Sequence, residues 1–200
     1  MRRTADSRKS QILTEATRLF SSRGFDRVTT KELAASCGVS EPALYRYFAS
    51  KDAIYDEVLS SLGARLQVKE LFARLEKEQD IEKLLFELAS DIFEFFRHNQ
   101  DAYRLMLYST LGGHAKAKRI YRAIRGTYVD FLIKQLDRLS AMGRIVPGNN
   151  EITGRCFVGM VFECALSGTL WKGFLGKRYR PREVVTNNVP IFARGLRAEL

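Results

Sequence analysis

The chain has 200 residues, of which 46% are hydrophobic and 28% are charged, a balance typical of a soluble globular protein with a sizeable core. Lysine and arginine number 33 against 23 acids, so the formal net charge is +10, which favours a polyanionic partner such as nucleic acid or a membrane surface. No apolar run approaches the roughly 20 residues of a membrane span. No apolar stretch follows the initial arginines as it would in a signal peptide, so we expect a cytoplasmic protein.

The cysteines and histidines do not indicate a metal or catalytic centre. Cys37, Cys156 and Cys164 form an odd set without Cys-x-x-Cys spacing, which argues against a disulfide framework and a zinc site. His98 and His114 stand apart from any cluster at metal-ligand spacing. We therefore expect no metal and no cofactor.

The chain is predicted to be all-α, because it has only 4 prolines and its apolar residues recur three and four apart. The first helix is predicted over 7–22. One face of it is apolar and consists of Ile12, Leu13, Ala16, Leu19 and Phe20. Gly24 can end this helix in the left-handed conformation, with Phe25 placed to contact Phe20.

Two short helices follow around a glycine turn. Thr29 and Glu32 have the spacing of a capping box at the start of the first, which directs Leu33, Ala34 and Cys37 inward. Gly38 ends that helix. Ser40 can cap the next, where Pro42 is tolerated because first-turn amides have no intrahelical partner.

Longer amphipathic helices fill the rest of the chain. The predicted spans are 50–62, 66–77, 81–98, 101–111, 115–142, 151–172 and 181–198. Pro190 and Gly195 favour a kink or an early end in the last of these.

Segment 30–48 has the dimensions of a helix-turn-helix, whose second helix lies in the DNA major groove. Val39, Leu44 and Phe48 define a stripe that is predicted to be buried. The opposite face carries Glu41, Pro42, Ala43, Tyr45, Arg46 and Tyr47. Arg46 can pair with guanine, Glu41 can accept from cytosine N4, and the phenols can donate to phosphates. The alternative is a solvated helix surface.

Lys51 lies in the first turn of the fourth helix, where a cation opposes the helix macrodipole. We expect a DNA phosphate to compensate this cost, since the ammonium and the helix N-terminus both attract it. Thr29 and Thr30 could hold phosphate in the same way at the start of the second helix.

These residues together resemble the amino-terminal signature of the tetracycline-repressor-type (TetR) regulators. The resemblance covers about 7–59 and rests on Phe20, Gly24-Phe25, Thr29-Thr30, Leu33-Ala34, Gly38-Val39-Ser40, Leu44-Tyr45-Arg46-Tyr47-Phe48 and Lys51. It implies a three-helix DNA-binding domain at 1–50 and a larger helical effector-binding and dimerisation domain at 51–200. The implied DNA contacts are Thr29, Thr30, Ser40, Glu41, Pro42, Ala43, Tyr45, Arg46, Tyr47 and Lys51. Glu41 departs from the neutral or basic residue common there, which affects the base preference.

Aromatic residues gather on the carboxy-terminal helices, and the resemblance favours a pocket for an apolar or aromatic effector among them. The candidate lining is Phe93, Phe96, Tyr103, Met106, Tyr128, Phe131, Phe162 and Trp171. Plain core packing is the alternative for each of these side chains.

The last two helices resemble the dimer interface of the family, a four-helix bundle with two helices from each subunit. The candidate contacts are Phe157, Val161, Ala165, Gly168, Val189 and Phe192. The resemblance implies a homodimer on a pseudo-palindromic double-stranded operator, released when an effector prefers another conformation. Repression is the usual outcome in the family, and activation stays open.

Two other classes of protein fit the sequence less well. An enzyme would need a nucleophile and base, a metal cluster or a phosphate-binding glycine loop, and the sequence shows none of these. A membrane-surface protein would need a strongly basic face on its first helix. Asp6 and Glu15 reduce the positive charge of that helix, so we expect no membrane partner.

Overall fold

The computed structural model describes residues 2–113, 115, 117–167 and 180–198. The regular elements of these residues are all helices, with one isolated bridge between Ile145 and Arg197, so the all-α prediction is confirmed. The chain divides into two compact units. Unit 1 consists of Met1–Leu66 and Asn99–Ala123, and unit 2 of Gln67–His98 and Ile124–Leu200. The functional division into 1–50 and 51–200 stays a prediction.

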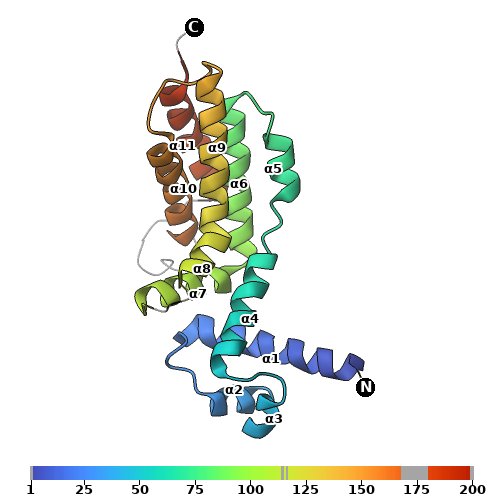
Figure 1. Ribbon diagram of the computed structural model, residues 1–200. Coiled ribbons are helices and arrows are strands. Elements are labelled where there is room, and N and C mark those ends of the chain that lie inside the picture. Colours follow the sequence, from blue (N-terminus) through green and yellow to red (C-terminus); the bar gives the residue numbers. More distant parts are fainter. Residues whose placement is uncertain (1, 114, 116, 168–179, 199–200) are drawn as a thin grey trace. The chain divides into compact units, whose positions relative to one another are not determined.

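Unit 1 is built around its first helix. The helices are α1 (Arg2–Arg23), α2 (Thr30–Ser36), α3 (Glu41–Tyr45), α4 (Lys51–Ala64), α7 (Gln100–Leu111) and α8 (Ala117–Tyr121) (Figure 1). α1 packs against α2, α4 and α7. Tyr55 is fully buried at the centre, with its ring 5.2 Å from that of Phe20 and 4.7 Å from that of Phe25. Its hydroxyl shares a hydrogen bond with the buried Ser109 of α7.

α1 begins at Arg2, before its predicted start at residue 7, but it ends close to the predicted residue, and α2 and α3 begin where they were predicted to. Each of these last three boundaries has a local cause. Gly24 is left-handed at φ 81° and its amide bonds to the Phe20 carbonyl, while the Phe20 and Phe25 rings lie 5.6 Å apart. Thr29 and Glu32 form both bonds of the capping box. Gly38 is left-handed at φ 66° in the turn, and the Ser40 hydroxyl accepts from the Ala43 amide.

Unit 2 is a bundle of longer helices. They are α5 (Lys69–Leu75), α6 (Ile81–His98), α9 (Thr127–Ala141), α10 (Asn150–Ser167) and α11 (Pro181–Leu196). α6 packs against α10 and α11, and α10 also packs against α9. The core of the bundle is aliphatic and aromatic, and its fully buried side chains include Leu84, Leu88, Ile92, Tyr128, Leu132, Phe157 and Phe162.

Two of the later helices also differ from their predictions. Within the span predicted as one helix at 115–142, the five residues of η1 (Arg122–Gly126) are π-helical and lie between α8 and α9. α11 continues through Pro190 to Leu196, so the early end suggested by that proline is wrong. No helix in the described part of the chain is both long enough and apolar enough to cross a membrane.

Candidate nucleic-acid interface

The two sides of α3 have different environments. Leu44 is fully buried and Phe48, just beyond the helix, is 4% exposed. Tyr45 is 46% exposed, and Pro42 and Arg46 are also exposed. The Arg46 guanidinium makes no hydrogen bond or ion pair with any described residue. The predicted orientation is therefore observed: one side anchors the helix in unit 1 and the other presents a free guanidinium to solvent.

The remaining predicted contacts on this segment are partly covered. Ala43 and Tyr47 are half-buried, and Ser40 is exposed at the helix start. Glu41 is half-buried, and its carboxylate accepts a hydrogen bond from the Thr30 hydroxyl of α2. A hydroxyl has one proton to donate, so Thr30 cannot give it to a phosphate while it holds Glu41. The bond fixes the first turn of α3 to the first turn of α2.

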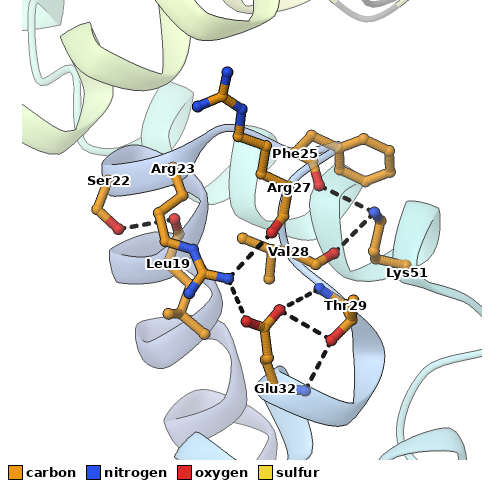
Figure 2. A network of polar contacts seen from close by, with 9 residues as sticks. All are labelled: Leu19, Ser22, Arg23, Phe25, Arg27, Val28, Thr29, Glu32 and Lys51. Atoms are coloured by element: carbon orange, nitrogen blue, oxygen red, sulfur yellow. Dashed lines mark hydrogen bonds and ion pairs between the residues drawn. The ribbon is translucent and has the colours of Figure 1, made fainter.

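Lys51 has a structural role that the sequence did not reveal. Its ammonium donates to the carbonyls of Phe25 and Val28, both at 3.0 Å, and lies 4.1 Å from the centre of the Phe25 ring (Figure 2). These carbonyls belong to the loop between α1 and α2. They supply the compensation that we had expected from a DNA phosphate alone, and they tie the start of α4 to the loop that leads into α2.

A second cation holds the same loop from α1. Arg23 donates to the Arg27 carbonyl at 3.1 Å and to the Glu32 carboxylate at 2.5 Å (Figure 2). The Glu32 carboxylate also accepts from the amide and the hydroxyl of Thr29. The Arg23 bond, followed by the bonds from Thr29, lowers the pKa of Glu32 from 4.5 to about 2. Loop 24–28 is thus held by cations from α1 and α4, and α2 begins from a fixed position.

A comparison with known protein families bears directly on this segment. Residues 12–58 match the family model described as bacterial regulatory proteins, tetR family. The match contains α2, the glycine turn, α3 and Lys51. Over these residues the chain belongs to the TetR family. Since this is a family of regulators and not of enzymes, the expectation of a non-catalytic protein is confirmed.

Similar proteins support the family assignment over part of this chain. The nucleoid occlusion factor SlmA of Haemophilus influenzae (strain PittGG) is 34% identical over 115 residues, 57% of this chain and 50% of that relative. The transcriptional activator FasR of Mycolicibacterium smegmatis is 33% identical over 101 residues, 50% of this chain and 46% of that relative. The chain thus spans about half the length of these curated relatives.

Solved structures match the fold over nearly the whole chain. Apo AibR has a TM-score of 0.65 at 20% identity and covers 92% of this chain and 97% of its own. The ketosteroid transcriptional regulator KstR2 of Mycobacterium tuberculosis has a TM-score of 0.65 at 19% identity, with 96% of each chain covered. At this identity the likeness supports the TetR fold and nothing finer.

The candidate effector residues are core side chains divided between the two units. Tyr103 and Met106 lie on α7 in unit 1, and both are buried. The others that the structure describes are buried in unit 2: Phe93, Phe96, Tyr128, Phe131 and Phe162. Phe162 contacts Phe96 and Tyr128, with ring centres 4.9 and 6.4 Å apart. Trp171 lies outside the described residues.

One polar pair adjoins this aromatic cluster of unit 2. The Tyr128 hydroxyl donates to the Asp91 carboxylate at 2.7 Å. Burial raises the pKa of Asp91, and burial followed by the nearby carboxylate raises that of Tyr128. This pair can orient a polar group of a bound molecule. In a closed core without a ligand, it also gives each of the two buried polar side chains a hydrogen-bond partner.

The candidate dimer residues lie mostly on the inner sides of α10 and α11. Phe157, Val161, Ala165 and Val189 are buried within the protomer, so they are not available to a partner, whereas Phe192 is half-buried. Gly168 lies outside the described residues. The solvent-facing sides of the two helices carry other apolar side chains: Ile152 is 59% exposed and Ile191 is 62% exposed.

No group of histidine, cysteine and carboxylate side chains in the described residues could hold a metal ion. Cys37 is buried, as expected of a small core residue, but Cys156 is exposed and Cys164 is partly so. Cys156 and Cys164, both on α10, are therefore not buried core residues like Cys37.

Proposed function

We propose that this chain is a DNA-binding transcriptional regulator that acts as a homodimer on a pseudo-palindromic operator. One observation carries the proposal: α3 buries Leu44 completely and leaves Tyr45 exposed, and Arg46, which directly follows the helix as its C-cap, is exposed as well. Arg46 can donate to the O6 and N7 acceptors of guanine. Pro42, Ala43 and Tyr45 would face the base edges when α3 lies in the major groove. The formal charge of +10 adds attraction to the duplex.

The proposed phosphate contacts flank this face. Ser40 and Tyr47 have hydroxyls at the start of α3 and at the edge of the exposed side, and Lys51 retains one N–H beyond its two carbonyl bonds. The Thr29 hydroxyl donates to Glu32, so Thr29 would donate to a phosphate only by giving up that bond. Thr30 would act through Glu41, whose free lone pairs can accept from cytosine N4. This division separates positioning groups from groups that read bases.

Dimerisation through α10 and α11 would use their solvent-facing sides, because the inner sides are already filled. Ile152 and Ile191 are the candidate anchors. A small apolar effector bound among the aromatics of unit 2 would favour one conformation of the dimer and release the operator, which is the repressor mechanism. We expect the protein to act in the cytoplasm.

The test is binding to duplex DNA from upstream of the protein's own gene, followed through a salt series. The proposal predicts a protected palindrome and an affinity that falls steeply as salt rises. Equal binding to any duplex, with no protected sequence, would contradict an operator-specific regulator.

A second candidate is nucleoid occlusion, because the similarity to SlmA of H. influenzae runs over 115 residues and so extends beyond the matched segment 12–58. Both candidates require sequence-specific DNA binding. Mapping the bound sites along the chromosome separates them. Sites at promoters whose transcripts change on deletion support the regulator, and sites without effect on transcripts support the alternative.

A further inference from the structure

A hollow of about 310 Å³ lies in unit 1, where the loop between α1 and α2 meets the C-terminal end of α7. Its lining comes from loop residues 23–27 and from residues 108, 109, 111 and 112. None of these residues belongs to the proposed DNA contacts. The volume lies at the lower end of the roughly 300–1,000 Å³ found for small-molecule sites, so an occupant must be small.

One wall of the hollow is apolar and firmly held. The Tyr108 ring lies against the loop so closely that a Cβ at Gly24 would stand 3.3 Å from one of its carbons. The Tyr108 hydroxyl donates to the Ser22 carbonyl at 3.2 Å. Even so, Tyr108 is 42% exposed and Leu111 is 84% exposed. A single exposed leucine needs no explanation, but beside a fixed aromatic ring it offers an apolar contact surface.

Two opposite charges at the hollow have no partner in the part of the chain that the structure describes. Asp26 and Arg27 are exposed, and neither side chain makes a hydrogen bond or ion pair with any described residue. Arg23, the other charged lining residue, is engaged with Glu32 and the Arg27 carbonyl. Figure 2 shows the Arg27 guanidinium pointing away from that network. The hollow therefore has one available cation and one available anion.

The anion lies at the end of a helix. The Asp26 carboxylate is 3.7 Å from the place where a Cβ on Gly112 would stand, and Gly112 follows the last residue of α7. The C-terminal end of a helix carries partial negative charge, so the carboxylate and the helix end both favour a bound cation. A purely anionic occupant would be repelled here, and a purely cationic one would leave Arg27 without a partner.

We propose that this hollow binds a free α-amino acid with an apolar side chain. Its ammonium group pairs with Asp26, its carboxylate pairs with Arg27, and its side chain lies on Tyr108 and Leu111. The bound molecule would contact the loop whose carbonyls hold Lys51 and from which α2 begins. The binding step itself does not depend on the proposed action on DNA.

The experiment is calorimetric titration of the full chain with L-phenylalanine and L-leucine. Two analogues of L-phenylalanine serve as chemical controls: 3-phenylpropanoate lacks the ammonium and 2-phenylethylamine lacks the carboxylate. The proposal predicts that each analogue binds at least about tenfold more weakly than L-phenylalanine, because each loses one charge-assisted contact. Absence of heat with both amino acids at millimolar concentration would overturn it.

Matched variants locate the site. D26N and R27Q should each weaken L-phenylalanine binding by about tenfold, whereas R104Q, at an exposed arginine of α7 that does not line the hollow, should leave it unchanged. Circular dichroism melting of the free variants confirms that all three are folded. L-phenylalanine binding that is equal in R27Q and R104Q would refute the assignment. Duplex binding is measured on the same preparations, so that failure of the ligand site and failure of the DNA site are told apart.

Discussion

Replacing Lys51 by methionine separates a structural role from a DNA-contact role. The substitution keeps most of the side chain and removes the ammonium that bonds to the Phe25 and Val28 carbonyls at 3.0 Å. A hydrogen bond to a charged group contributes about 1.5–3 kcal/mol. Lys51 is half-buried, so water replaces part of the lost interaction, and we expect a net loss of about 2 kcal/mol. For a chain of this size that lowers Tm by roughly 4–8 °C.

The assay is thermal unfolding without DNA, followed by circular dichroism. The control is Lys31→Met, since Lys31 is exposed on α2 and has no partner among the described residues. This variant should change the free energy of unfolding by no more than about 0.5 kcal/mol, as is usual for a surface substitution, and its Tm should stay close to that of the wild type. If K51M melts like the wild type and only the salt dependence of duplex binding falls, by about one charge, Lys51 is a phosphate contact and our interpretation of the loop is wrong.

Three further predictions concern stability. Leu44→Ala should lower the free energy of unfolding in urea by about 2–5 kcal/mol because the Leu44 side chain is fully buried. The neighbouring Tyr45→Ala should lower it by about 0.5 kcal/mol or less. A larger loss for Tyr45→Ala than for Leu44→Ala would contradict the orientation of α3. Thr30→Val and Glu41→Gln should show a coupling of about 1 kcal/mol in a double-mutant cycle of urea unfolding, and additive effects would exclude the bond between them. The folded-state pKa of Glu32 lies below its unfolded value, so its contribution to stability is present above pH 4.5 and is lost as pH falls towards 2. The Tm difference between wild type and Glu32→Gln should therefore shrink over that interval, and a constant difference would count against the Arg23 pairing.

The sequence predicted the elements whose causes are local. The capping box at Thr29, the left-handed conformation of Gly24, the turn at Gly38 and the burial of Leu44 depend on residues within a few positions of one another. In the same way, the exposure of Tyr45 on α3 and of Arg46 directly after it followed from helical spacing alone.

Contacts between segments far apart in the chain could not be predicted from local sequence patterns. The Lys51 ammonium reaches carbonyls 23 and 26 positions away, and any backbone can supply a carbonyl, so no residue type marked the partner. Tyr55 and Ser109 are 54 positions apart, and neither residue predicts the other. The apolar positions of α10 were recognised, but periodicity does not distinguish a side that packs within the protomer from one that faces a partner, which is why Phe157 and Val161 were assigned to the interface.

The central claim is that the exposed side of α3 reads bases. Once a protected operator is known, equilibrium affinities of the wild type and of R46A are measured for duplexes that carry every single-base change in one half-site. R46A should lose about 1–3 kcal/mol of discrimination at one base pair per half-site and keep it elsewhere, with unchanged Tm. The same pattern of base preference in R46A and the wild type would contradict it.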